Sequence, residues 1–332
     1  MHSAKSKPDQ RPAGTTQNIV MKKKAHDRWL VVINPNAGTR KGEKDWERIS
    51  LLLTDNGFDF HPVFTETRLH AMKLTVDFIQ RGFRKIIVVG GDGTMNEVVN
   101  GIFRQKVVPT TDIMLGMISV GTGNDWVRTF NIPTAYKGAV EILRRESTML
   151  QDAGIVKYQN DHCEKSRYFI NMAGLGFDGL VAQKTNRDKD LGRSNPLIYI
   201  KNLVSSLFAY KSSQTKVIVD GQVISDKIFS ISIGIGQFNG GGMRQAPDAL
   251  PDDGLFDLTL IKDMKKLSVV ASIRRLYNGT IGQHKRVMTL VGKFIRIESE
   301  IPVLLETDGE SLGHSPFEFQ IVPKSVRVIV NP

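Results

Sequence analysis

The sequence has almost no cysteine, no long apolar run and no secretory leader. Cys163 is the single cysteine among 332 residues, so no internal disulfide can form, as is typical of proteins in a reducing cytosol. No stretch approaches the roughly 20 apolar residues that a membrane-spanning helix needs. Residues 1–17 also lack the apolar segment of a signal peptide. We therefore expect a cytoplasmic protein without membrane spans.

Motifs of several common nucleotide-binding and nucleic-acid-binding classes are also missing. No G-x-x-x-x-G-K-[ST] occurs, which excludes a P-loop. Paired Cys/His fingers and an aromatic RNA-binding stretch are absent, so we expect no nucleic-acid partner. Residues 174–179 match G-x-G-x-x-G, but residues 195–202 hold no acid where a dinucleotide-binding unit needs one. A dehydrogenase is therefore not expected.

What the sequence does have is an excess of positive charge. Lys and Arg number 45 against 34 Asp and Glu, which gives a formal net charge of +11. Part of the excess lies in residues 1–28, and a second basic cluster runs from Arg274 to Arg286. Such a charge suits an anionic membrane surface or a phosphate-rich ligand, with a plainly solvated basic face as the alternative.

The pattern of apolar residues divides the chain into a tail and two domains. Residues 1–26 are polar and basic without periodicity, which predicts a disordered tail. In residues 27–158, short buried-strand patterns alternate with helical ones, which predicts a Rossmann-like parallel α/β sheet covered by helices on both faces. The strands expected there are 29–33, 85–89 and 114–118, and the helices are 46–56, 71–81 and 96–103.

Residues 159–332 change to short strands separated by turns, which predicts a largely antiparallel β domain. The last residues could return to the first domain. Helices are expected at 197–210 and 265–277. The strands expected are 168–172, 215–219, 228–235, 256–261, 294–298, 303–306, 317–322 and 325–330.

Three glycine-rich turns in the first domain each follow a predicted buried strand. They are Asn34–Gly38, Gly90–Thr94 and Gly121–Asp125. Strand ends in a parallel sheet meet at one edge, where ligands bind. Glycine lets backbone N–H groups approach phosphate oxygens, and the helix that follows adds the positive end of its dipole. A single turn of this kind is usually only a turn, but the three together predict a nucleotide-phosphate site.

The ordered motifs resemble the diacylglycerol kinase catalytic-domain family, specifically its soluble bacterial lipid kinases, with sphingosine and ceramide kinases as more distant relatives. Besides the three turns, Gly174–Asp178, Pro247–Asp257 and Asp308–Glu310 resemble family motifs, so that the similarity covers roughly residues 28–330. It implies an antiparallel β-sandwich as the second domain and an active site in the cleft between the two domains.

The resemblance also implies the roles of individual residues. Asp92 and Asp125 would organise Mg²⁺ and water around the phosphates, since a hard cation prefers oxygen ligands. Asp308 or Glu310 would accept the proton of the acceptor hydroxyl, and the sequence leaves both open. ATP would contact Asn34, Pro35, Asn36, Ala37, Gly38, Thr65, Gly91, Asp92, Gly93, Thr94, Met95, Asn96, Glu97 and Thr122.

A second, structural Mg²⁺ is implied by the spacing of Leu250, Asp253 and Leu255, which resembles a family site built from two backbone carbonyls and one carboxylate. The competing interpretation of this segment is a plain tight turn, and the sequence leaves both open.

The resemblance implies a lipid acceptor, with diacylglycerol preferred over phosphatidylglycerol, sphingosine or ceramide. The alternatives are a kinase of a soluble substrate such as NAD and a non-catalytic, nucleotide-dependent membrane regulator. An apolar helix over 197–210 could be core or face lipid, and its flanking basic residues suit peripheral contact with an anionic membrane. A homodimer is left open as well. The flanking residues are Lys184, Arg187, Lys189, Arg193, Lys201 and Lys211.

Overall fold

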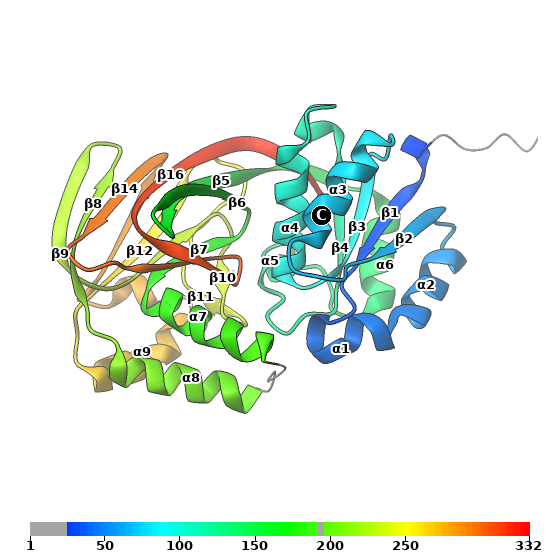
Figure 1. The fold of residues 1–332 in the computed structure, drawn as a ribbon. Coiled ribbons are helices and arrows are strands. Elements are labelled where there is room, and N and C mark those ends of the chain that lie inside the picture. The colour runs from blue at the N-terminus through cyan, green and yellow to red at the C-terminus, as the bar shows by residue number, and fades with distance from the viewer. Residues whose placement is uncertain (1–24, 192–195) are drawn as a thin grey trace, which may run out of the picture.

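The computed structural model describes residues 25–191 and 196–332. The predicted tail lies almost entirely outside these residues, as does Arg193, and the side chain of Lys189 is not described either. Two lobes follow one another along the chain, with the first at the right of Figure 1 and the second at the left.

The first lobe is built on four parallel strands in the order β4-β3-β1-β2. β1, β3 and β4 are almost entirely buried, because helices cover both faces of the sheet. β2 contains Pro62, which cannot donate a ladder hydrogen bond and is tolerated at the sheet edge. The strands are β1 (Trp29–Ile33), β2 (Phe60–Phe64), β3 (Lys85–Gly90) and β4 (Met114–Ser119).

Helices α3 and α4 pack together on one face of this sheet, whereas α2 and α6 pack on the other (Figure 1). Helix α4 begins at Asp92, four residues before the predicted start, so the second glycine turn supplies the first turn of the helix. The helices are α1 (Ala37–Lys44), α2 (Trp46–Asp55), α3 (His70–Gln80), α4 (Asp92–Arg104), α5 (Asp125–Thr129) and α6 (Tyr136–Arg145), with short 3-10 turns at Ala25–Asp27 and Thr110–Asp112.

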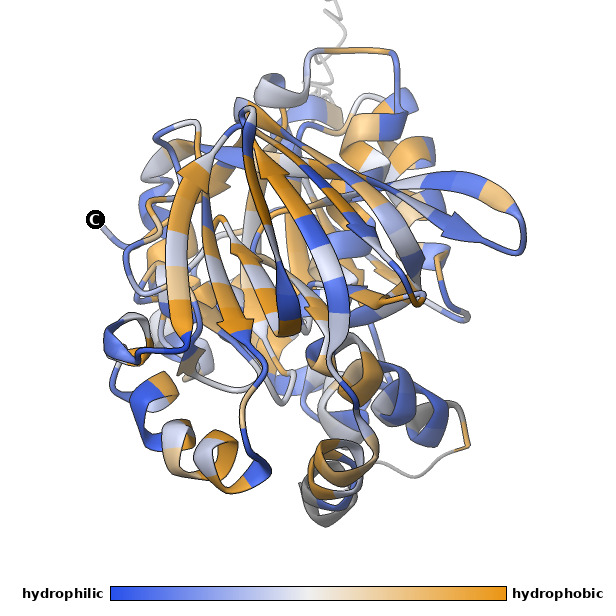
Figure 2. Cartoon of the chain, turned by 90° about the vertical axis from the view of Figure 1, so that its left-hand side faces the viewer, coloured by the Kyte–Doolittle hydropathy of each residue, from blue (hydrophilic) through white to orange (hydrophobic). Residues whose placement is uncertain are grey.

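The second lobe consists of antiparallel strands around a core of its own. Burial alternates along β14, for example, where Ile295 and Ile297 are buried between exposed Phe294 and Arg296. Figure 2 shows this alternation as orange and blue bands along the strands. The strands are β5 (Thr148–Asn160), β6 (Cys163–Phe169), β7 (Met172–Gly176), β8 (Ser213–Val219), β9 (Gln222–Gly234), β10 (Phe238–Asn239), β11 (Met243–Arg244), β12 (Phe256–Lys262), β13 (Val287–Gly292), β14 (Phe294–Ser299), β15 (Leu304–Thr307) and β16 (Glu310–Ile329).

The long strand β16 connects the two lobes. Its first residue, Glu310, pairs with Thr307 of β15, and its end runs parallel to β4, where Arg327 pairs with Met114. The two strands predicted over 317–330 are therefore one continuous strand, which places a residue of the late acidic motif and the return to the first sheet on the same element.

Three helices cover the second lobe: α7 (Phe177–Asp190), α8 (Pro196–Ala209) and α9 (Lys266–Tyr277), followed by a 3-10 turn at Ile281–Gln283. The predicted fold class, a parallel α/β domain followed by an antiparallel β domain, is confirmed. Among the described residues, no helix combines the length and the apolar character needed to cross a membrane.

Candidate active site between the two lobes

The three glycine turns meet at the carboxyl edge of the parallel sheet. A Cβ atom on Gly38 would overlap the carbonyl oxygen of Val120, so the first turn lies directly against the third. A Cβ on Gly91 would lie 3.3 Å from the Cα of Gly121, which joins the second turn to the third. The close approach of three backbones requires glycine at these positions. The turns predicted to form one site are therefore side by side.

The first turn is strained where it enters α1. Gly38, Thr39 and Arg40 all have left-handed backbone angles, with φ between 61° and 66°. This conformation costs a non-glycine residue about 1–2 kcal/mol. Such strain persists only where the surroundings enforce it, and it gathers at functional sites. Thr39 and Arg40 were not among the predicted site residues, because a sequence does not display a positive φ at non-glycine positions.

A hollow of about 260 Å³ opens beside these turns. Five predicted nucleotide-contact residues line it, together with Glu310 from the second lobe. The hollow therefore lies between the lobes. Its lining residues are Asn34, Asn36, Thr65, Glu66, Thr67, Arg68, Thr94, Glu97, Asn186 and Glu310.

Asn34 fixes the first turn to the second. Its Nδ2 donates to Oγ1 of Thr94 at 2.9 Å, and its Oδ1 accepts the backbone N–H of Asn36 at 3.0 Å. Because both polar ends of the amide are engaged, the side chain holds the two turns in a defined relative position at the rim of the hollow.

Asp92 is the first residue of α4 and receives N–H groups from the third turn. The backbone N–H of Trp126 donates to its Oδ1 at 3.1 Å, and that of Asp125 donates to its Oδ2 at 3.3 Å. Burial raises the pKa of Asp92 even though these hydrogen bonds favour the charged form. Asp92 therefore ties two of the turns together.

Asp125 begins α5 and reaches across to the second lobe. Its Oδ2 accepts the N–H of Gly241 at 2.9 Å, and its Oδ1 accepts that of Gly242 at 2.7 Å. Burial, with the neighbouring charge of Asp92, raises its pKa to about 6. A Cβ on Gly123 would lie 3.0 Å from Oδ2 of Asp92 and 3.2 Å from Oδ2 of Asp125. The two carboxylates predicted to act together do lie together.

Glu97 and Arg68 shape the opposite rim. The Glu97 carboxylate accepts the N–H groups of Leu69 at 2.8 Å and Ala71 at 3.1 Å, which caps α3. Arg68 donates to Oε2 of Glu310 at 3.0 Å. The loop before α3 is thereby anchored to α4 on one side and to the second lobe on the other.

The two acids of the late motif have different surroundings. Asp308 is buried, and its carboxylate accepts Nδ2 of Asn96 at 2.8 Å and the N–H groups of three consecutive residues from Ile170 at 3.0–3.1 Å. Burial raises its pKa to about 6. Glu310 is 26% exposed and faces the hollow, and its Oε1 would lie 2.6 Å from a Cβ on Gly93. Only Glu310 has a carboxylate open to a ligand.

Arg167 of β6 is a buried cation that the sequence analysis did not identify. Its Nε donates to Oδ1 of Asn96 at 2.8 Å, and its charge interacts with Glu310 and Glu97. Burial lowers its pKa. No motif surrounds this residue, and only the packing of β6 against α4 brings it behind the hollow.

Several predicted residues lie away from the hollow. The side chain of Met95 packs in the core of the first lobe, and that of Asn96 is enclosed among Asp308, Arg167 and Tyr168. We therefore no longer expect either side chain to touch a nucleotide. Thr122 is exposed on the third turn. The remaining residues, Pro35, Ala37, Gly38, Gly91 and Gly93, belong to the turn backbones.

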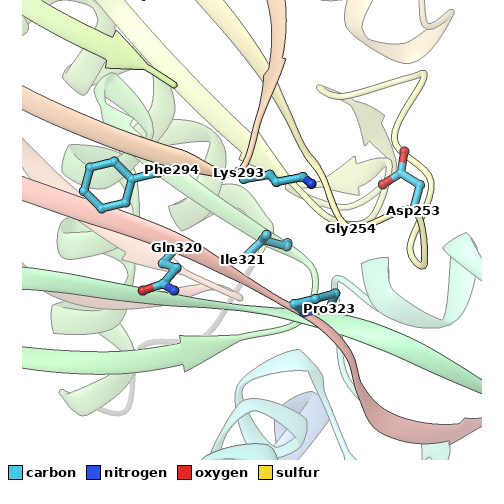
Figure 3. Close-up of a pocket in the computed structure, with 7 residues that line it drawn as sticks. All are labelled: Asp253, Gly254, Lys293, Phe294, Gln320, Ile321 and Pro323. Carbon is cyan, nitrogen blue, oxygen red and sulfur yellow. The ribbon is translucent and has the colours of Figure 1, made fainter. Parts of the chain in front are cut away.

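The predicted structural metal segment forms a tight turn, and its residues do not line the hollow. Oδ1 of Asp253 accepts the N–H of Leu255 at 3.0 Å. Asp253 also borders a depression of about 520 Å³, in which Lys293 is the other charged side chain (Figure 3). The described residues contain no group of three or more His, Cys, Asp or Glu side chains arranged for a metal. A site built from two carbonyls and one carboxylate remains a prediction.

Behind the late motif lies an enclosed acid pair. Glu306 accepts Nδ2 of Asn239 at 2.9 Å and the N–H of Gly309 at 2.9 Å, and burial raises its pKa to about 8. Asp178 of α7 accepts the Ser230 hydroxyl at 2.8 Å, and burial raises its pKa to about 6. Neither residue has a role predicted from the sequence.

Comparison with known proteins agrees with this architecture. Residues 28–156 match the diacylglycerol kinase catalytic domain, and residues 171–330 match the YegS C-terminal NAD kinase beta sandwich-like domain. A diacylglycerol kinase of Staphylococcus haemolyticus is 28% identical over 299 residues, covering 90% of this chain and 86% of that protein. One of Staphylococcus carnosus is 27% identical over 298 residues, covering 90% and 93%.

A solved structure from Bacillus anthracis superposes with a TM-score of 0.73 at 26% identity, covering 92% of this chain and 98% of that chain. The two matched domains coincide with the two lobes that border the hollow. The chain therefore carries a diacylglycerol kinase catalytic domain followed by a YegS-like C-terminal domain, and it is a lipid kinase.

Proposed function

We propose that the enzyme transfers the γ-phosphoryl group of ATP to the hydroxyl of a membrane lipid, with diacylglycerol as the preferred acceptor and phosphatidic acid as the product. A kinase of this family uses ATP as its co-substrate. The observation that supports the proposal most directly is the meeting of three glycine turns at a hollow that also receives Glu310 from the second lobe.

We assign the phosphates of ATP to the first turn of α4 and the turns beside it. The backbone N–H groups at the start of α4 have no partner within the helix, and the helix dipole favours an anion there. Asn34, Asn36 and Thr94 line the hollow and would position the nucleotide. The strain at Thr39 suits a loop held in a conformation that a ligand uses.

The pair Asp92 and Asp125 fits a hydrated Mg²⁺. Their Oδ2 atoms face the same point beside Gly123. Burial and, after it, the charge of Asp92 raise the pKa of Asp125, and a divalent cation would relieve the repulsion between the two carboxylates. Each oxygen that accepts one N–H retains a second lone pair for a metal or a water. When bound, Mg²⁺ supplies charge neutralisation for the phosphates. We keep Leu250, Asp253 and Leu255 as the proposed structural magnesium site.

We propose Glu310 as the group that accepts the proton of the lipid hydroxyl. It is partly exposed to the hollow and lies against Gly93, at the helix end where the phosphates would sit. Asp308 would act as a positioning residue, because its carboxylate already accepts four donors and holds the turn that carries Glu310. The buried Arg167 would keep the rear of the site electropositive.

The acceptor can be identified by incubating the full chain with γ-labelled ATP and Mg²⁺. Mixed micelles would contain diacylglycerol, phosphatidylglycerol, ceramide or sphingosine, and a parallel reaction would contain NAD. We expect label on diacylglycerol above the other lipids, and its loss when Mg²⁺ is chelated. Label on another lipid would replace the acceptor, whereas label on NAD and on no lipid would overturn the proposed function.

A further inference from the structure

Helix α9 presents three large apolar side chains to solvent. Leu267 is 85% exposed, Val270 is 50% exposed and Tyr277 is 54% exposed, whereas Ser272 is the one buried residue of the helix. A surface helix of a water-soluble domain ordinarily has a polar outer face. Helix α9 therefore carries apolar residues on both sides: Val269 packs inward, whereas Leu267 and Val270 face solvent.

Helix α8 also exposes large apolar side chains. Phe208 is 73% exposed and Val204 is 48% exposed, and they lie four residues apart on one face of the helix. The residues that α8 turns inward include Ser206 and Leu207. Phe208 is thus a large aromatic side chain directed into solvent from a helix that has a polar residue buried behind it.

The end of α8 and the start of α9 are adjacent. Nζ of Lys266 donates to the carbonyl oxygen of Tyr210 at 2.5 Å, and Leu207 and Val269 pack on the same small cluster around Phe229. In Figures 1 and 2, both helices lie along the lower edge of the second lobe. We call this surface the α8–α9 face and define it by Val204, Phe208, Leu267, Val270 and Tyr277.

The α8–α9 face is bordered by cations. Lys201 and Arg274 lie on the same helix faces as the apolar residues, and Lys211 and Lys265 lie where the two helices join. All four are exposed. Lys262 pairs with Asp226, but within the described part of the chain no carboxylate forms an ion pair with any of these four. The border therefore carries uncompensated positive charge.

Helix α7 connects this face to the hollow. Asn186 of α7 lines the hollow and donates to the carbonyl oxygen of Gly309 at 3.3 Å. On the other side of α7, Asp188 accepts Nδ2 of Asn202 of α8 at 2.7 Å. The α8–α9 face is therefore one helix layer away from Glu310.

We propose that the α8–α9 face docks the enzyme on an anionic lipid bilayer. Its apolar side chains would enter the boundary between headgroups and acyl chains, and its cations would meet the lipid phosphates. This inference rests on the proposed function, since a lipid acceptor must be taken from a bilayer. A second copy of the chain fits the face less well, because a symmetric interface would oppose the same unpaired cations.

The docking test compares two double variants of exposed apolar residues. F208S with L267S alters the face, whereas V107S with V223S alters exposed valines elsewhere and is the matched control. Sedimentation would use vesicles of phosphatidylcholine with about one third phosphatidylglycerol. We expect the face variant to bind at least about tenfold more weakly, and the control to bind as the wild type does. Equal binding of the face variant and the wild type would overturn the proposal.

The contribution of the bordering cations to membrane binding is tested with a separate variant and a neutral control lipid. K265Q with R274Q should weaken binding to the anionic vesicles by about fivefold for each charge, and it should leave the weaker binding to pure phosphatidylcholine unchanged. An equal loss on both kinds of vesicle would overturn the role of the cations.

Activity on a dispersed substrate separates docking from catalysis. With a short-chain diacylglycerol below its micelle concentration, we expect both double variants to keep the wild-type kcat/KM. If the wild type phosphorylates no lipid, the proposed function fails, while vesicle binding still decides the docking surface. If F208S with L267S instead turns a dimer into a monomer and binds vesicles normally, the face is a self-association surface and the proposal is wrong.

Discussion

The three carboxylates at the β15–β16 turn have different surroundings. Glu310 faces the hollow, whereas Glu306 and Asp308 are enclosed by protein. Glu310 is partly open and carries a single salt bridge to Arg68. Glu306 and Asp308 are buried and fully engaged by amides. An acid that is enclosed by protein and out of reach of the hollow holds the fold together, whereas an acid that faces the hollow can receive a proton or contact a ligand.

The largest difference between the open acid and the enclosed acids is expected for Glu310→Gln. Loss of a general base at the acceptor hydroxyl should lower kcat by about 10²- to 10⁴-fold. Stability should change little, because the residue is partly exposed and its pair with Arg68 is near the surface. Steady-state kinetics with mixed micelles and a denaturation curve measure the two effects. A kcat within threefold of the wild type would remove Glu310 from the mechanism.

Asp308→Ala, in contrast, should lower the stability of the fold strongly. It would leave one amide N–H of Asn96 and three backbone N–H groups without their buried acceptor, which should cost about 3 kcal/mol of unfolding free energy or more. Urea denaturation measures this loss. Glu310→Ala is the matched control and should change stability by less than about 0.5 kcal/mol. Equal stability of the two variants would end the distinction between the open and the enclosed acid.

Glu306 should make the stability of the protein depend on pH. Its folded pKa is raised from 4.5 to about 8, so the folded state binds a proton more tightly than the unfolded state. Between these values, stability should fall by up to about 1.4 kcal/mol for each pH unit. The contribution is complete below pH 4.5 and lost as the pH rises through about 8.

Glu306→Gln isolates this effect, because the amide is neutral at every pH and its oxygen can still accept a hydrogen bond. Denaturation midpoints measured from pH 5 to pH 9 should show a flatter profile for the variant than for the wild type. Parallel profiles would mean that the enclosed acid is ionised in the folded state.

The first lobe was predictable because its signals are local. The strands at 29–33, 85–89 and 114–118 were predicted to within one residue, since continuous apolar runs are typical of strands buried on both faces. The three glycine turns were predicted for the same reason, because each is contiguous in sequence. The first turn of α4 was missed, because Asp92 and Gly93 are poor helix formers in isolation and the helix end is stabilised by contacts with the third turn.

The second lobe and the roles of its acids were less predictable because they depend on distant contacts. Asp308 is held by Asn96, 212 positions earlier, and by backbone groups more than 130 positions earlier. No local pattern distinguishes it from Glu310, two residues later. Strand β16 was divided in two at Pro323, where pairing with β5 shifts register but does not end. Arg167 had no motif at all.

The smallest effect is expected from relieving the backbone strain at Thr39, in the first glycine turn. Thr39→Gly would remove the cost of a left-handed threonine, about 1–2 kcal/mol, and would add about 0.4–1 kcal/mol of entropy to the unfolded chain. We therefore expect a gain in stability of about 0.5 kcal/mol, together with a higher KM for ATP because the phosphate loop is freer. Thr54→Gly within α2 is the control and should lose about 0.5 kcal/mol, since its backbone is helical. If both variants lost stability equally, the left-handed turn would store no strain for the nucleotide site to use.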